Sequence, residues 1–263
     1  MEFLKNINQK DLRFILFQLN KNTSNLKCNV MNKFSIIIPT FNEKKNIRLL
    51  IKRIKESLKK KIYEIIVIDD NSYDGSSEIF KDLKKKEKNF FFHIRKKETR
   101  DLSKSVLLGV KKSRYSNLLI MDGDLQHNPK YLSTLCKIFL KKKLDVLVAV
   151  RDFSKRSGLS FTRFFLSLLI ILVINLIFKK KTSDPMSGFF VIKKKIFIEN
   201  EKNLYLKGFK ILFDVIYSTK KNLRIQDYKI KFISRKNNKS KMSLKILLHI
   251  ILIIFQKKIL KIF

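Results

Sequence analysis

The sequence contains few cysteines and no long uninterrupted apolar run. Its two cysteines, Cys28 and Cys136, are too few for a disulfide framework, so we expect a reducing compartment. Cys136 lies within a helical apolar pattern, which is typical of a core residue rather than a catalytic one. The two most apolar segments, residues 164–178 and 244–255, are shorter than the roughly 18 to 20 residues that a membrane-spanning helix needs. These absences argue against a disulfide scaffold and against a helix that crosses a membrane.

Acidic residues are also scarce, because 22 Asp and Glu stand against 59 Lys and Arg, for a formal net charge of +37. A basic excess of this size indicates a polyanionic partner, which could be nucleic acid, anionic lipid or a phosphorylated substrate. Lys, Ile, Asn and Phe are all abundant, so AT-rich coding DNA is an alternative explanation for part of the charge. The chain has 263 residues, 45% of them hydrophobic, which suits one large α/β domain or a domain with appendages.

Buried strands and helices alternate along the first two thirds of the chain. The stretch "FSIIIPTFNE" (34–43) begins as an apolar, β-branched strand and leads into a helix that Asn42 can cap. The stretch "YEIIVIDDNSYDGSSEIF" (63–80) repeats this pattern, and "FFFHIRK" (90–96), "SNLLIMDGD" (116–124) and "LDVLVAVRD" (144–152) supply three more strands. Strands that are apolar on both faces predict an α/β fold with a mainly parallel sheet, covered by helices on both sides.

The turns that follow these strands carry most of the polar residues of interest. In a parallel sheet, ligands bind beyond the carboxyl ends of the strands. The turns after residues 38, 68, 121 and 150 should therefore lie along one edge and form a site. The polar or turn-forming residues collected there are Pro39, Glu43, Asp69, Asp70, Asp122, Asp124 and Arg151.

The stretch "MDGDLQHNPK" (121–130) concentrates acid in an otherwise basic chain. Asp122 and Asp124, two residues apart at the end of a strand, can both approach one hard cation, and Gln126 adds an amide oxygen. Mg²⁺ or Mn²⁺ bound in this way keeps some water and shares substrate phosphates. The alternative is a turn held by Asx hydrogen bonds, in which His127 is a turn residue rather than a ligand.

Six short motifs follow one another along the chain: "IPTFNE", "VIDDNSYDG", "MDGDLQHNP", "SDPMSGFF", "GFK" and "FISRKNNKSKM". Their order resembles that of family 2 glycosyltransferases, and they are most similar to the dolichyl- or polyprenyl-phosphate mannose synthase branch. The resemblance covers roughly residues 34–242. Its most specific part is "DGDLQHNP" together with "SDPMSGFF" and the Arg and Lys of the last motif.

The resemblance implies a GT-A fold and an inverting, metal-dependent transfer of mannose from GDP-mannose to a polyprenyl monophosphate. The residues that would contact the nucleoside are Pro39, Phe41, Glu43, Ile68 and Asp70. The sugar-diphosphate would lie against Asp122, Gly123 and Asp124, and the metal, Mg²⁺ or Mn²⁺, would bind Asp122, Asp124 and Gln126. The residues that would meet phosphates or the donor sugar are Arg151, Lys210, Arg235 and Lys241. Of all these, Asp122, Asp124, Arg235 and Lys241 would be catalytic.

Four departures from the family pattern concern the site. Phe41 replaces a tyrosine, which removes a hydroxyl and keeps a ring for stacking, and Gly123 replaces the commoner alanine. The stretch "TRDLSKS" lacks the glycine that usually follows the arginine at Arg100, so we expect a different loop there. The stretch "RKNNKSK" replaces a version with glycine and glutamate, while Arg235 and Lys241 keep their spacing.

The two apolar segments indicate contact with a membrane surface. If residues 164–178 alone crossed the bilayer, Asp124 and Arg235 would lie on opposite sides and could not share one donor. We therefore expect both segments to be in-plane helices, with flanking lysines that attract anionic headgroups at the cytoplasmic face, as in a peripheral or monotopic protein. A buried core helix is the alternative for the first segment.

The predicted organisation has an N-terminal extension (1–33), a GT-A catalytic domain (34–242) with an apolar interface helix at about 160–178, and a basic amphipathic C-terminal helix (243–263). Other functions remain open: the same fold with UDP-glucose or another donor, a different lipid or glycan acceptor, an inactive scaffold, or a nucleic-acid-binding protein. We expect no nucleic acid partner, because the lysines are spread along the whole chain instead of clustering on one face. Two long apolar segments would also have no function in nucleic-acid binding.

Overall fold

The computed structural model describes residues 33–59, 62–96, 99–151, 161–179, 181–208 and 210–231, together with Leu252 and Ile254. Side chains in the first part of this 161–179 range, up to residue 168, are not among those described. Arg235, Lys241, nearly all of the N-terminal extension and most of the C-terminal segment lie outside these ranges. The predictions made for them stay predictions.

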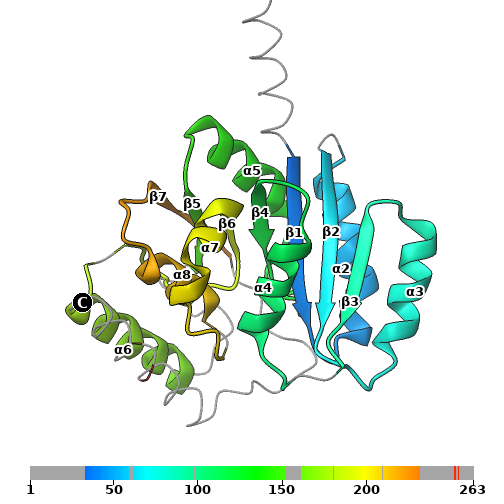
Figure 1. Cartoon of the computed structure of the whole chain (residues 1–263), viewed down its shortest axis with the longest axis horizontal. Coiled ribbons are helices and arrows are strands. Elements are labelled where there is room, and N and C mark those ends of the chain that lie inside the picture. Colours follow the sequence, from blue (N-terminus) through cyan, green and yellow to red (C-terminus); the bar gives the residue numbers. More distant parts are fainter. Residues whose placement is uncertain are drawn as a thin grey trace, which may run out of the picture.

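Seven strands form one sheet within the described residues, and Figure 1 shows it flanked by helices. The strands are β1 (Lys33–Thr40), β2 (Ile62–Asp69), β3 (Phe90–Ile94), β4 (Asn117–Ile120), β5 (Val146–Arg151), β6 (Phe190–Lys193) and β7 (Ile225–Ile230). Their order across the sheet is β3-β2-β1-β4-β6-β5-β7. The first five are the strands that the sequence predicted, and β1, β2, β4 and β5 are largely buried because their side chains face helices on both sides.

All strands run parallel except β6, which pairs antiparallel with both β4 and β5. The sequence analysis did not predict β6 or β7. The direction of β6 matters for the site, because Phe190 at its beginning lies beside Ile120 at the end of β4. The loop that precedes β6 is thereby brought to the carboxyl edge of the parallel strands.

Helices cover both faces of the sheet (Figure 1). Their bounds are α2 (Lys44–Ser57), α3 (Ser76–Lys86), α4 (Leu102–Lys112), α5 (Leu132–Lys141), α6 (Phe161–Ile177), α7 (Lys194–Asn200) and α8 (Ile211–Ser218), with short 3₁₀ turns η1 (Pro129–Tyr131) and η2 (Glu201–Asn203). Apolar residues of α2, α3 and α5 form one core with one face of the sheet, and those of α4, α6, α7 and α8 form the other. Cys136 of α5 is fully buried in the first core, as predicted.

The prediction that Asn42 caps the helix after β1 is wrong. Glu43 holds the N-cap position of α2 and makes no side-chain cap hydrogen bond. Asn42 instead adopts a left-handed conformation with φ 56°, and its Oδ1 accepts a hydrogen bond of 3.1 Å from the N–H of Tyr73. This contact joins the turns after β1 and β2, so the side chain organises the edge of the sheet rather than the helix.

Candidate active site

The candidate site lies at the point where the order in which strands are added to the sheet reverses direction. From β1 the chain builds β2 and β3 on one side and then crosses to β4 on the other, so β1 and β4 are parallel neighbours. Loops that leave such a pair in opposite directions open the crevice in which these folds bind ligands. The carboxyl ends of β1, β2, β4 and β5 share this edge, which confirms the placement expected from the strand pattern.

The turn after β4 carries Asp122 and Asp124, which are both partly exposed. The N–H of Asp122 donates to Nδ1 of His127 over 3.4 Å, and the His127 ring stacks on Phe189 with 5.2 Å between centroids. The N–H of Gln126 donates to Oδ1 of Asp124 over 3.0 Å. These contacts hold the backbone of the turn, while 33% of the Asp122 side chain stays exposed. The buried His127 therefore links the backbone of the turn to Phe189.

Two glycines bring neighbouring loops against this turn. A Cβ atom at Gly188, just before β6, would lie 2.5 Å from Oδ2 of Asp122 and 2.9 Å from its Oδ1. A Cβ atom at Gly123 would lie 3.0 Å from Cγ2 of Thr40. The carboxylate of Asp122 thus occupies space that any other residue at position 188 would fill.

The donor atoms at this turn suit a hard divalent cation. Asp122 and Asp124 offer two carboxylates from one turn, and the absence of a side chain at Gly188 lets the first of them lie close to the neighbouring loop. Within the ranges that the structure describes, no group of three or more His, Cys, Asp or Glu side chains could hold a metal ion by itself. The two carboxylates fit a divalent cation that completes its coordination with water and phosphate oxygens.

A buried ion pair lies beside the acidic turn. Nε and Nη2 of Arg151, at the end of β5, donate to the two carboxylate oxygens of Asp184 over 2.8 and 3.0 Å. Asp184 is completely buried, so this two-pronged contact is well shielded from water. Burial by itself lowers the pKa of Arg151, but the charge of Asp184 and its hydrogen bonds outweigh burial and raise that pKa above its ordinary value.

Lys210 stands close enough to these charges for all of them to affect its protonation. Burial, together with the positive charge of Arg151, lowers the pKa of Lys210 to about 8. The carboxylates of Asp184 and Asp122 act in the opposite direction. Lys210 and Arg151 therefore supply positive charge next to the acidic turn, where a diphosphate bound to a cation would need it.

The turns after β1 and β2 present an aromatic surface. The Arg100 guanidinium lies 4.2 Å from the centroid of the Phe41 ring, and the Tyr73 ring meets the same ring edge-on at 5.7 Å. Tyr73 is 82% exposed. Nearby, Oε2 of Glu43 accepts a hydrogen bond of 2.6 Å from Nδ2 of Asn46. A partly exposed ring with a hydrogen-bonded carboxylate beside it can stack a base and accept hydrogen bonds from a nucleoside.

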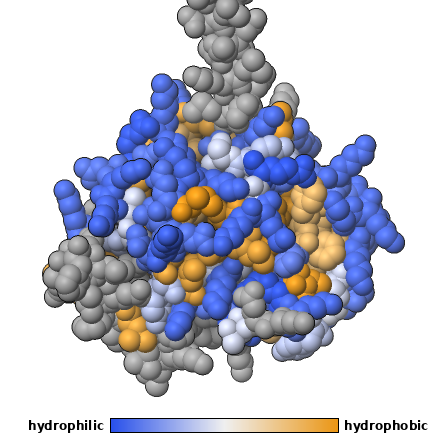
Figure 2. All heavy atoms as spheres, viewed as in Figure 1, coloured by the Kyte–Doolittle hydropathy of each residue, from blue (hydrophilic) through white to orange (hydrophobic). Residues whose placement is uncertain are grey.

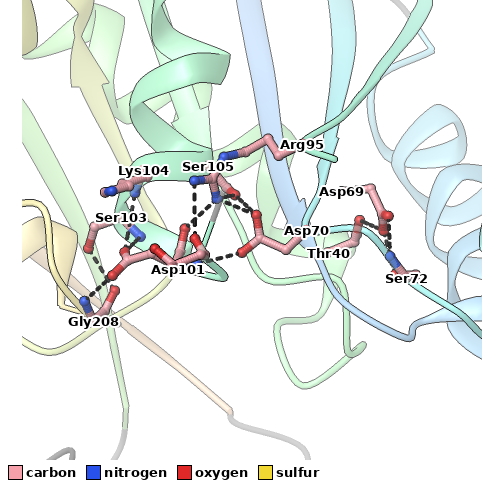
Figure 3. A network of polar contacts seen from close by, with 11 residues as sticks. Thr40, Asp69, Asp70, Ser72, Arg95, Asp101, Ser103, Lys104, Ser105 and Gly208 are labelled. Carbon is pink, nitrogen blue, oxygen red and sulfur yellow. Dashed lines mark hydrogen bonds and ion pairs between the residues drawn. The ribbon is translucent and has the colours of Figure 1, made fainter. Parts of the chain in front are cut away.

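Asp70 belongs to a buried polar network that Figure 3 shows from close by. Its Oδ1 accepts hydrogen bonds from Nη1 of Arg95 and Oγ of Ser105, and its Oδ2 accepts from the N–H of Asp101 over 2.9 Å. Asp70 is 8% exposed and Arg95 is 4% exposed. On the other side of the same turn, burial raises the pKa of Asp69, although donors on Ser72 and Thr40 oppose that shift. Both acids of this turn are thus engaged by protein donors.

Residues 35–200 match the family described as Glycosyl transferase family 2. The chain belongs to this family. A dolichol-phosphate mannosyltransferase of Pyrococcus furiosus is 33% identical over 192 residues, which are 72% of this chain and 53% of that protein. A protein of the same name from Saccharomyces cerevisiae is 31% identical over 191 residues, 70% of each chain. The chain thus spans about half the length of the Pyrococcus relative.

Solved structures confirm the GT-A-type fold that the resemblance implied. Mannosyl-3-phosphoglycerate synthase from Rubrobacter xylanophilus superposes with a TM-score of 0.65 at 15% identity, over 88% of this chain and 74% of that one. Glucosyl-3-phosphoglycerate synthase from Mycobacterium tuberculosis, crystallised with Mn²⁺, UDP-glucose and phosphoglyceric acid, gives 0.65 at 14% identity, over 86% and 80%. At these identities the likeness concerns the fold alone.

The structure brings most of the predicted site residues to one edge of the sheet. Pro39 and Ile68 are buried near the ends of β1 and β2, at the same level as the loops that carry the remaining candidates. Arg235 and Lys241 lie outside the described residues. The individual binding roles stay predictions.

Sequence reasoning missed four residues that build this candidate site. Asp184 pairs with Arg151, Gly188 makes room for Asp122, and Arg95 and Asp101 hold Asp70. The motif "SDPMSGFF" contains Asp184 and Gly188, so the motif signalled the right segment without indicating what each residue does. No local pattern marked Arg95 as buried, because it follows a strand in a lysine-rich stretch.

The helix α6 is apolar on two sides. Ile170, Ile174 and, just past its end, Phe178 are buried in the same core as residues of α8, so this side of the helix fits the alternative of a buried core helix. The opposite side exposes large apolar side chains: Leu169, Leu172, Val173, Leu176 and Ile177. Hydrophilic residues dominate the face seen in Figure 2, and apolar surface shows at the lower left, where Figure 1 draws α6. No helix among the described residues is long and apolar enough to cross a membrane.

Proposed function

We propose that this glycosyltransferase moves mannose from GDP-mannose to a polyprenyl monophosphate, with inversion at the sugar carbon, at the cytoplasmic face of a membrane. One observation carries the proposal: an acidic turn suited to a cation, Asp122 and Asp124, stands beside Lys210 and the ion pair of Arg151 with Asp184 at the switch point of the sheet. The names of the relatives from Pyrococcus furiosus and Saccharomyces cerevisiae support the choice of donor sugar and acceptor.

Residues at the ends of β1 and β2 would hold the nucleoside. The Phe41 ring offers a face for the base, and Arg100 over the same ring limits where that base can stack. Glu43 has carboxylate oxygens that can accept hydrogen bonds from the base or the ribose. Pro39, Ile68 and Asp70 would shape this end of the site, since all three are buried.

The acidic turn and its basic neighbours would handle the charge of the leaving group. Asp122, Asp124 and Gln126 are the residues that would hold Mg²⁺ or Mn²⁺, which when bound neutralises a diphosphate and makes it a better leaving group. Lys210 supplies a positive charge that needs no reorganisation during the reaction, and Arg151 is fixed by Asp184. Arg235 and Lys241 would add to this charge.

The acceptor requires no catalytic base. A phosphate monoester has a second pKa near about 6, so its oxygen is largely deprotonated at neutral pH and can attack the sugar carbon directly. This chemistry agrees with the residues present, because the buried His127 is engaged by the backbone of Asp122 and by Phe189. The site residues then need only orient the two phosphates and stabilise the charge that leaves.

The exposed side of α6 would bring the protein to its lipid acceptor. Five large apolar side chains on that side cost free energy in water, and inserting them into the headgroup region recovers about 25 cal/mol per Å² of buried apolar surface. Lys179 follows at the end of α6 and is exposed, so it can attract anionic headgroups at about 1 kcal/mol for one basic residue.

The decisive experiment is a transfer assay. Purified protein is incubated in vesicles with polyprenyl phosphate, Mg²⁺ or Mn²⁺ and a panel of labelled GDP- and UDP-sugars. We expect label from GDP-mannose in the lipid phase, abolished by chelation. Label from a UDP-sugar instead would replace the donor, and donor binding without lipid label would replace the acceptor.

A second experiment tests the membrane contact by itself. Leu172→Gln with Leu176→Gln should lower binding to anionic vesicles, because both side chains lie on the exposed side of α6. Leu49→Gln is the matched control, since Leu49 is also an exposed leucine but lies on α2. Equal binding by both variants would contradict the proposed contact.

A further inference from the structure

Gly208, two residues before Lys210, is held through both of its backbone polar groups (Figure 3). Its N–H donates to Oδ2 of Asp101 over 2.7 Å. Its carbonyl accepts from Oγ of Ser103 over 2.8 Å and from the N–H of Ser103 over 3.2 Å. Gly208 has φ 90°, a conformation that other residues rarely adopt, so the backbone turns sharply at the point where it is held.

The other contacts of Asp101 anchor it to the rest of the sheet. Its Oδ1 caps α4 by accepting from the N–H groups of Ser103 and Lys104 over 2.9 and 3.3 Å. Its N–H donates to Oδ2 of Asp70, and its carbonyl accepts from Nη1 of Arg95 over 3.1 Å. Asp101 therefore joins a buried ion pair at the end of β2 to a loop that lies 107 residues further along the chain.

Lys210 lies between the start of α8 and Gly208, whose contacts with Asp101 and Ser103 we call the clamp. Its carbonyl accepts a hydrogen bond of 3.1 Å from the N–H of Asp214 in the first turn of α8. The side chain of Asp214 in turn accepts from the N–H groups of Tyr205 and Leu206 over 3.1 and 3.0 Å. The loop before α8 is thus fixed at its beginning by Asp214 and next to Lys210 by Asp101.

We propose that Asp101 is a positioning residue for Lys210: it fixes the loop that sets the ammonium group beside the acidic turn of Asp122 and Asp124. A cap for α4 needs only Oδ1, so helix capping alone leaves the contact between Oδ2 and Gly208 unexplained. The proposal rests on the function proposed above, in which Lys210 meets the donor.

Asp101→Ser separates the two roles. Serine is as good an N-cap as aspartate, so α4 keeps its cap, but no second oxygen remains for Gly208. Glu64→Gln is the matched control, because Glu64 is also a buried carboxylate with a hydrogen-bond network, at the opposite end of β2. Amide hydrogen exchange should accelerate in residues 204–208 of the Asp101 variant and stay unchanged in the control.

Kinetics in two backgrounds test whether Asp101 acts through Lys210. In the otherwise native chain, Asp101→Ser should lower kcat roughly 10- to 100-fold and also raise KM for the donor, since a displacement of about 1 Å can cost that much and Lys210 meets the donor. In a Lys210→Ala background the same substitution should change kcat less than about twofold, because the group it positions is gone.

Equal losses of kcat in both backgrounds, or unchanged exchange near Gly208, would overturn the proposal. A native protein that transfers no sugar from any donor would instead defeat the proposed function. The clamp is then judged by amide exchange alone, and unchanged exchange in the Asp101 variant counts against it in the same way.

Discussion

Two acidic turns follow buried strands on the same edge of the sheet, and they hold their carboxylates differently. After β2, Asp69 is 1% exposed and Asp70 is 8% exposed, and both accept hydrogen bonds from several protein donors. After β4, Asp122 keeps a third of its side chain exposed and lies against Gly188, a residue without a side chain. The composition of the turns is similar, so their surroundings decide which acids can meet a ligand.

The difference comes from the residue that the neighbouring strand or its loop places against each turn. β3 leads directly into Arg95, whose guanidinium lies under the turn after β2 and is paired with Asp70. β6 begins beside the end of β4, and the residue two positions before it is Gly188. At the first turn, the buried guanidinium of Arg95 pairs with Asp70. At the second turn, Gly188 has no side chain, so the carboxylate of Asp122 can lie against it.

The largest expected effect is on catalysis at the second turn. Asp124→Asn keeps an oxygen for the N–H of Gln126, so the turn should stay folded, but it removes one negative charge from the cation site. We expect transfer to fall roughly 10²- to 10³-fold, with a free energy of unfolding within about 0.5 kcal/mol of the native value. Labelled lipid and urea titrations measure the two quantities.

The control for lost charge is Asp82→Asn, which removes an acid from the surface of α3. It should leave transfer unchanged. A large loss of stability in Asp124→Asn would show that the second turn is structural in the same sense as the first, and would erase the contrast between them.

The next largest effect is on stability at the first turn. Asp70→Asn leaves the guanidinium of Arg95 buried without its ion partner, which costs about 3 kcal/mol in comparable pairs. Adding Arg95→Met should recover part of that loss, because it removes the unpaired charge. Chemical denaturation of both variants measures the effect, with the exposed Glu78→Gln as a control expected to change nothing.

An outcome in which Asp70→Asn unfolds like the native protein but loses donor binding would contradict this assignment. It would mean that Asp70 meets the nucleoside directly, as the family resemblance implied.

The elements that could be predicted from the sequence are the strands made of continuous apolar residues. β1, β2, β4 and β5 are buried on both faces, so their sequences are largely apolar and the strand pattern alone places their turns on one edge. β7, "IQDYKI", is a partly exposed strand at the end of the sheet, and its polar residues hide it from the same pattern. β6 has only four residues and follows a glycine-containing loop.

Long-range pairing explains what the sequence could not supply at the site. Arg151 and Asp184 are 33 residues apart, and Asp101 and Gly208 are 107 apart, so no local pattern records either contact. The helix α6 presents a different problem, because it is apolar nearly all round and periodicity cannot separate its packed side from its exposed side.

A smaller effect is expected from the space beside Asp122. Gly188→Ala places a Cβ atom 2.5 Å from Oδ2 of Asp122, so the carboxylate must move. We expect transfer to fall roughly 10- to 100-fold, since catalytic groups tolerate little displacement. Gly123→Ala is the comparison and should cost less, because its Cβ would meet Cγ2 of Thr40 at 3.0 Å and would not touch a carboxylate. Similar losses from both alanines would show that the turn tolerates neither methyl group.

The smallest effect concerns pH and depends on Lys210. Its pKa is lowered to about 8, so the free protein loses this positive charge as the pH rises through that value, whereas an ordinary lysine keeps its charge to about 10.4. Affinity for GDP should therefore weaken by up to about tenfold between roughly pH 7 and pH 9, because the protonated form attracts the diphosphate.

The stability of the fold changes in the opposite sense. The unfolded chain binds the proton of Lys210 more tightly, so this group increases the free energy of unfolding above about pH 8. Loss of folding therefore does not explain weaker binding. Lys210→Arg keeps its charge throughout and should make the affinity nearly independent of pH, as isothermal titration would measure. A native protein whose GDP affinity does not change over this range would place Lys210 away from the diphosphate, and the second acidic turn would then lack the positive neighbour that distinguishes it from the first.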